Sequence, residues 1–179
     1  MDCSRFAARL MLVIAAALSA GASAEVSGVS ATGFLVTHRQ EVNATPQRVF
    51  DAIGQVDRWW NVEHSYSGRG ANLHLDLSAG GCFCERWDTG SVQHAQVVYV
   101  DRRNSTVRLL GALGPLQARA AHGVLTFAAA PLDGKTVLTV TYRVVGPADV
   151  GLDKSAAGVD QVIGDAAARL ARFAGGGTP

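Results

Sequence analysis

The 179-residue sequence has little that would mark a charged partner. Charged residues make up 17% of it, and 16 basic side chains face 15 acidic ones, a formal net charge of +1 at pH 7. Proteins that bind nucleic acid or anionic membranes usually carry a basic surface. The balanced charge therefore argues against both as the main partner.

Recognisable catalytic and cofactor motifs are also missing. The sequence has no G-x-S-x-G elbow, no phosphate loop and no dinucleotide fingerprint. Its five histidines fall in separate segments without metal-ligand spacing: His38, His64, His74, His94 and His122. We therefore expect no cofactor and no metal site, and the absence of an acid–base constellation favours binding over catalysis.

The N-terminal segment is apolar but short. Arg5 and Arg9 precede an apolar run from Leu10 to Ala20, and Ala22-Ser23-Ala24 is a small-x-small cleavage signal. The run is shorter than the roughly 20 residues of a membrane span. We expect a signal peptide over residues 1–24, a periplasmic or secreted protein, and no membrane span in the mature chain. An uncleaved anchor is the alternative.

The remaining chain has the length of a single domain. Small residues dominate positions 25–33, and glycines begin the segment 175–179. We expect a flexible leader over 25–33, a folded domain over 34–174 and a flexible tail over 175–179.

Hydrophobic periodicity predicts the order of the elements. Residues 34–43 alternate as a strand, and Thr45 and Pro46 begin a short helix as N-cap and first helical residue. Alternation resumes at Leu73, and a two-residue turn at Gly80-Gly81 would place Cys82, Cys84 and Arg86 on the leucine face of a hairpin. Further strands are expected over 92–101, 106–112, 122–130 and 136–145.

The last element differs from these strands. Apolar residues recur every three or four positions from Val159 to Phe173, which predicts an amphipathic helix ended by Gly175. Strands followed by one long helix indicate an α+β fold with the helix packed across one face of an antiparallel sheet.

Three segments carry a resemblance to a known family. They are Ala44 to Ile53 (ATPQRVFDAI), the pair Trp59-Trp60, and Gly80 to Glu85 (GGCFCE). The chain resembles the SRPBCC superfamily, also called START-like or Bet v 1-like, in the branch similar to the Aha1 C-terminal domain. The resemblance implies a helix-grip fold, in which a curved sheet of about six or seven strands wraps around the C-terminal helix and leaves a cavity. Members are similar in housing lipids, polyketides or aromatic compounds, and some are cyclases or hydrolases.

The expected cavity provides the candidate binding site. Its wall would combine one tryptophan of the pair with inward residues of the strands and the last helix. The candidate ligand-binding residues are Trp60, Leu75, Leu77, Cys84, Arg86, Tyr99, Leu110, Phe127, Tyr142 and Leu170. In the connection 111–117, Leu113 and Leu116 would cover apolar surface, either as a gate over the cavity or as a loop packed on the core.

Cys82 and Cys84 allow three interpretations. On an extended strand they share a face at roughly 6.5–7 Å between Cα atoms, at or past the limit of a relaxed disulfide. They could be buried free thiols, a disulfide that needs a bulge, or ligands of a soft ion such as Cu(I). Free buried thiols are the expected state.

We therefore expect a monomer or weak dimer whose partner is a small hydrophobic molecule. The alternatives are a cyclase- or hydrolase-type enzyme using the same cavity, with Arg86, Tyr99, Tyr142 or a histidine as acid, base or oxyanion donor, and a metal or redox protein working through Cys82 and Cys84.

The cleavage signal generates the first testable prediction. N-terminal sequencing of the exported protein should begin at Glu25, because Ala22 and Ala24 fit the small subsites of a signal peptidase. A mature protein that retains Met1 and sediments with membranes would overturn the expected export.

Overall fold

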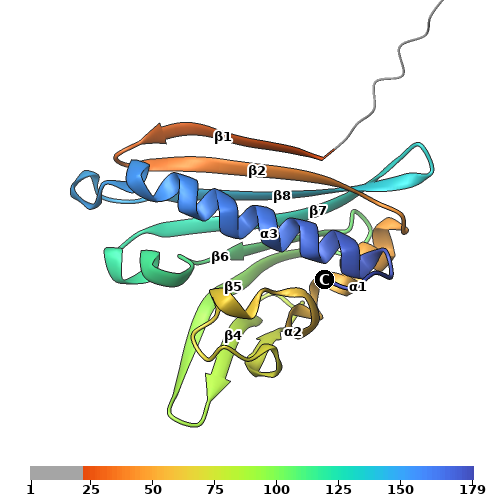
Figure 1. Ribbon diagram of the computed structural model, residues 1–179, viewed down its shortest axis with the longest axis horizontal. Helices are drawn as coiled ribbons and strands as arrows, with labels where there is room; N and C mark the ends of the chain where they lie inside the picture. The colour runs from red at the N-terminus through yellow and green to blue at the C-terminus, as the bar shows by residue number, and fades with distance from the viewer. Residues whose placement is uncertain (1–21) are drawn as a thin grey trace, which may run out of the picture.

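The computed structural model describes residues 22–179 as one antiparallel sheet of eight strands and a long helix (Figure 1). The sheet order is β1-β2-β8-β7-β6-β5-β4-β3. The strands are β1 (Ser23–Ser30), β2 (Gly33–Val42), β3 (Leu73–Leu75), β4 (Cys82–Trp87), β5 (Gly90–Asp101), β6 (Thr106–Leu110), β7 (His122–Leu132) and β8 (Lys135–Val145). The α-helices are α1 (Pro46–Ile53), α2 (Val56–Trp59) and α3 (Ala156–Ala174). Short 3₁₀ segments are η1 (Val62–His64), η2 (Gly70–Asn72), η3 (Gly114–Arg119), η4 (Ala148–Val150) and η5 (Leu152–Ser155).

Helix α1 begins where the sequence predicts. The Thr45 hydroxyl accepts a hydrogen bond from the Arg48 amide at 3.2 Å, and Pro46 occupies the first turn, where its missing N–H costs nothing. The helix ends at Gly54, where an added Cβ would lie 3.1 Å from the Leu77 side chain. Close packing against Leu77 thus favours glycine there.

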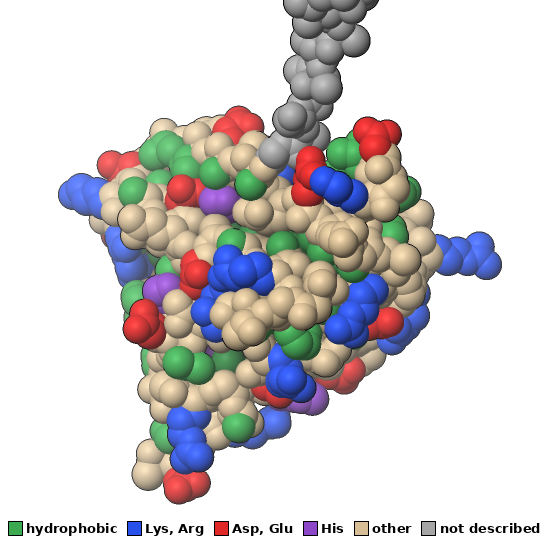
Figure 2. Space-filling model, turned by 45° about the vertical axis from the view of Figure 1, so that its right-hand side comes forward, with side chains coloured by type: hydrophobic (Ala, Val, Ile, Leu, Met, Phe, Trp, Pro, Cys, Tyr) green, Lys and Arg blue, Asp and Glu red, His purple; other side chains and the backbone are tan. Residues whose placement is uncertain are grey.

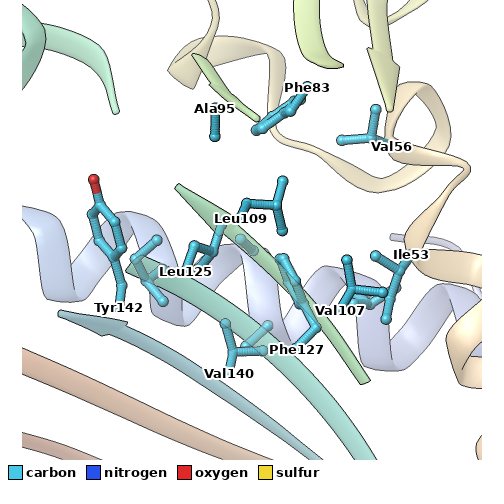
Figure 3. Packing of buried hydrophobic residues seen from close by; sticks show 14 of the residues in the cluster. Ile53, Val56, Phe83, Ala95, Val107, Leu109, Leu125, Phe127, Val140 and Tyr142 are labelled. Carbon is cyan, nitrogen blue, oxygen red and sulfur yellow. The ribbon is translucent and has the colours of Figure 1, made fainter. Parts of the chain in front are cut away.

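Helix α3 crosses the concave face of the sheet and lies in front of β2, β8 and β7 (Figure 1). Its apolar stripe, including Ile163, Ala166 and Leu170, is buried. The structure therefore has the helix-grip fold, which confirms the predicted fold class. In the apolar core, Ile53 lies beside Val107 of β6 and Phe127 of β7, while Val56 lies on the side of Phe83 (Figure 3).

The surface carries charges of both signs. Figure 2 shows Lys and Arg interspersed with Asp and Glu over the visible face, and apolar side chains only in small groups. Among residues 22–179, no helix combines the length and apolar character needed to cross a membrane.

The prediction of a flexible leader over residues 25–33 is wrong for most of that segment, because Ser23–Ser30 forms strand β1 at the edge of the sheet. β1 pairs with the edge of β2, from Ser23 opposite Arg39 to Ser27 opposite Leu35. Its side chains are mostly exposed, so no apolar alternation marks it. Backbone pairing alone makes it a strand. Residues 1–21 of the expected signal peptide lie outside the described residues, and cleavage after Ala24 stays a prediction.

The predicted register of the β3–β4 hairpin is also wrong. Leu73 pairs with Glu85 and Leu75 with Phe83, because residues 76–81 form a longer turn than two glycines. Relative to the expected pairing, the strands are displaced by an odd number of positions, which exchanges the two faces of β4. Phe83 and Glu85 are therefore buried, and Arg86 is exposed.

Cys82 and Cys84 form a disulfide, which corrects the expectation of free thiols. Their Cα atoms are 5.3 Å apart, closer than on an extended strand and inside the normal range for the bond. The pairing of β4 with β5 shifts register between Phe83 and Cys84, so the regular spacing assumed for β4 is broken here.

The contact of α3 with β2 generates a stability prediction. A Cβ at Gly164 would lie 2.7 Å from the ring of buried His38, whereas a Cβ at Gly158 on the same helix meets nothing within 4 Å. Gly164→Ala should lower the free energy of unfolding by about 1–3 kcal/mol through overpacking. Gly158→Ala should raise it by about 0.5–1 kcal/mol through helix propensity.

Urea unfolding of both variants measures the difference. Equal stabilisation by the two substitutions would show that the His38 ring moves aside freely and that α3 is not held at this distance from β2.

Candidate functional site

A cavity of about 300 Å³ lies between the first half of α3, segment η3, strand β5 and the loop after α2. Its wall is mainly apolar or aromatic, with few polar side chains. The lining residues are Trp60, His64, Tyr66, His94, Leu113, Gly114, Pro115, Leu116, Arg119, Tyr142, Ser155, Gly158, Val159, Val162 and Ile163. Exposed Tyr66 and Pro115 stand at its rim.

The structure brings two of the ten predicted site residues to this cavity, Trp60 and Tyr142. Leu75, Phe127 and Leu170 are buried in the apolar core and do not line it, and half-buried Leu77 packs against that core. That Trp60 and Tyr142 contact a ligand stays a prediction.

The other four predicted residues lie on the outer side of the sheet, which corrects their assignment to the cavity. Arg86 and Cys84 are there because of the hairpin register. Tyr99 is there because β5 shifts register between Val97 and Tyr99, and its ring lies under the Arg108 guanidinium. Leu110 is 48% exposed because its neighbour Leu109 takes the inward position.

Tyr142 anchors the connection between β6 and η3. Its hydroxyl accepts a hydrogen bond from the Leu113 amide at 2.9 Å and donates one to the Gly111 carbonyl at 3.0 Å. Burial raises the pKa of Tyr142 to about 12. The phenol is therefore neutral at physiological pH, and both of its hydrogen-bonding functions are used by the protein.

Arg119 ties η3 to the start of α3. Its guanidinium donates to the Ser155 hydroxyl at 2.6 Å and to the Val150 carbonyl. Within residues 22–179, no carboxylate lies at ion-pair distance from it. This cross-link fixes the loop containing Leu113 and Leu116 as a wall of the cavity.

Glu85 is the only acidic side chain in the described part of the chain that is buried. Its carboxylate accepts hydrogen bonds from the Tyr66 amide at 3.0 Å and the Ser67 amide at 2.5 Å. The His94 Nε2 lies 3.2 Å from the same carboxylate. These contacts hold the loop after α2 against β4 and β5.

The pKa values of this pair follow from its surroundings. Burial alone would raise the pKa of Glu85, but hydrogen bonds from the Tyr66 and Ser67 amides and from His94 outweigh it and lower that pKa. Burial lowers the pKa of His94, and Glu85 only partly opposes this. Glu85 is therefore ionised and His94 neutral at pH 7.

His94 reaches the cavity through a β-bulge. Phe83 pairs with Ala95 and Cys84 with Gln93, so His94 is the extra residue on β5, and both His94 and Ala95 are buried. Strict alternation would turn one of the two outward. The sequence offers no marker for the bulge, so it does not predict His94 as a site residue. Glu85 escapes prediction for a different reason, the register of the β3–β4 hairpin.

Aromatic rings surround this polar pair. The Phe83 ring lies 4.8 Å from the His94 ring, and the Trp60 ring lies 5.3 Å from Phe83. Tyr66 stacks on Trp87, with planes 4° apart. Trp60 donates its indole N–H to the His64 carbonyl at 3.1 Å, so it presents an apolar ring to the cavity.

Comparisons with known proteins support the fold. No family model and no curated protein matches the sequence. CalU16 from Micromonospora echinospora superposes with a TM-score of 0.57 at 13% identity, over 88% of this chain and 86% of CalU16. An uncharacterised protein from Rhizobium leguminosarum superposes with a TM-score of 0.51 at 22% identity, over 83% of this chain and 97% of that one. At such identities the likeness shows the fold alone.

The Glu85 cluster generates a prediction for stability. Glu85→Gln should lower the free energy of unfolding by about 2–3 kcal/mol, since the amide keeps one acceptor where the carboxylate has two. Glu63→Gln, at an exposed position in η1, should change it by less than about 0.5 kcal/mol.

The same cluster predicts an acid sensitivity. Because the pKa of Glu85 is lowered in the folded protein, its ionised carboxylate stabilises the fold at pH values above the ordinary carboxyl pKa. This stabilisation is lost as the pH falls through the lowered pKa. The lowered pKa of His94 adds a loss that begins below about pH 6.5, where the unfolded imidazole binds a proton first. Denaturant unfolding across pH should show a decline in wild type, and the part of that decline below the ordinary carboxyl range should be smaller in Glu85→Gln. Identical pH profiles would contradict the assigned charge states.

Proposed function

We propose that the protein binds a small hydrophobic molecule in the cavity between the sheet and α3. The observation that carries this proposal is the cavity itself, about 300 Å³ with a mainly apolar and aromatic wall. Ligand sites are typically such concave apolar spaces with a few fixed polar groups. The helix-grip fold supports the same conclusion, because the family that the sequence resembles has members that house hydrophobic compounds in this cavity.

An aromatic ligand suits the wall better than a flexible chain does. Trp60, Tyr66 and His94 present ring surfaces, and offset or edge-on ring contacts add to the energy of apolar burial. The volume is at the lower end of the range for ligand pockets, which favours a compact molecule of two or three rings over a long lipid.

Two finer assignments are part of this proposal. The segment from Ala44 to Ile53 and the tryptophan pair support the branch similar to the Aha1 C-terminal domain. The cleavage signal at Ala22 to Ala24 supports export. The metal alternative has less support, because the disulfide between Cys82 and Cys84 leaves neither sulfur as a thiolate that could bind an ion.

Filling the cavity tests the proposal. Val162 of α3 lines the cavity, and its neighbour Gln161 is exposed on the same helix. Val162→Trp should weaken binding of the neutral fluorescent probe N-phenyl-1-naphthylamine by about tenfold or more. The larger side chain occupies the space in which the probe would make its packing contacts. Gln161→Trp, the matched control, should bind the probe as wild type does.

Probe fluorescence titration provides the measurement, with circular dichroism to confirm folding. Undiminished probe binding in a folded Val162→Trp variant would place the binding site elsewhere.

A further inference from the structure

We propose that the His94–Glu85 pair selects ligands that carry a hydroxyl group, by accepting a hydrogen bond from that hydroxyl on His94 Nδ1. This rests on the proposed function and deepens it. The ligand class is a compact aromatic molecule with a neutral phenolic or similar O–H, and the pair supplies the polar contact that orients it in the cavity.

The neutral His94 ring carries its proton on Nε2. Glu85 accepts from two backbone amides and lies 3.2 Å from His94 Nε2. An ionised carboxylate can only accept hydrogen bonds, so Nε2 must carry the proton of the neutral ring. The second nitrogen, Nδ1, is then left with a free lone pair.

The Nδ1 atom of His94 is free to accept a hydrogen bond from a ligand. In the part of the chain that the structure describes, no protein group bonds to Nδ1, and it is not among the polar atoms sealed from solvent. The ring lines the cavity. A molecule that enters the cavity can therefore reach an acceptor without displacing a protein partner.

The other polar side chains of the cavity wall do not offer a free buried acceptor. The Tyr142 hydroxyl is engaged by Leu113 and Gly111, and the Trp60 N–H is engaged by the His64 carbonyl. Arg119 offers only donors, and the Ser155 hydroxyl accepts one of them. The His64 side chain is exposed and not buried. His94 is thus the buried acceptor in this wall that the fold leaves unused, and an O–H on the ligand is its complement.

Glu85 has a role in holding the His94 ring in place. A buried carboxylate is costly to desolvate, and an apolar residue at such a site often stabilises a protein equally well. Glu85 fixes both the tautomer and the orientation of the His94 ring, as carboxylates do behind functional histidines elsewhere. It acts as a positioning residue behind the contact, and His94 makes the contact.

A matched pair of probes tests the inference: 2-naphthol and its methyl ether, 2-methoxynaphthalene. In a cavity without an acceptor the ether should bind more tightly, because the hydroxyl must give up its water. With His94 as acceptor, wild type should bind 2-naphthol about five- to tenfold more tightly than the ether, the usual net effect of one hydrogen bond.

His94→Phe keeps a ring at this position and removes the acceptor, so the preference for 2-naphthol should disappear while the ether still binds. His122→Phe, the matched control, changes an exposed histidine that does not line the cavity and should retain the preference. If His94→Phe does not fold, His94→Leu replaces it, and ether binding identifies the variant that retains its cavity.

The outcomes separate the two proposals. If wild type binds neither probe, the proposed function fails. If wild type binds the ether as tightly as 2-naphthol or more tightly, or if a folded His94 variant keeps the preference, hydrophobic binding stands and the role of His94 is overturned.

Discussion

The packing of α3 against the concave face of the sheet is the interaction on which the rest of this structure depends. Gly164 lets the helix approach β2 closely, and His38 Nε2 lies 2.7 Å from Asp160 across the contact. The second half of the helix packs on the sheet through buried apolar residues such as Ala166 and Leu170. The first half faces a part of the curved sheet that it does not fill, and the cavity lies there.

The cavity wall is held in place by polar contacts, although its lining is mostly apolar. Arg119 fixes η3 to Ser155, Tyr142 fixes the chain at Gly111 and Leu113, and Glu85 fixes the loop at Tyr66 and Ser67. Each contact satisfies backbone or side-chain groups that a loop would otherwise turn toward water. The loops that close the space are therefore positioned by specific hydrogen bonds, which is how an apolar cavity can persist without collapsing.

These contacts also bear on whether the cavity could catalyse a reaction. Arg86 and Tyr99, two groups considered for acid–base chemistry, lie on the outer side of the sheet. Tyr142 has a raised pKa and a fully engaged hydroxyl, so it is a poor proton donor or acceptor for a ligand. His94 is the group that retains a free function. One neutral acceptor beside an apolar surface suits the ligand recognition proposed above.

The sequence by itself determined the order and type of most elements and the start of α1, because capping residues and apolar periods are local signals. The helix-grip fold followed from the family resemblance of three segments. The sequence also predicted that Trp60 and Tyr142 face the cavity, and both line it. Only the tertiary structure decided β1, the face of each residue in β4, the cysteine pairing and the His94–Glu85 pair. Each depends on a backbone partner, a turn length or a bulge, and a shift of one position there reverses which side chains point inward.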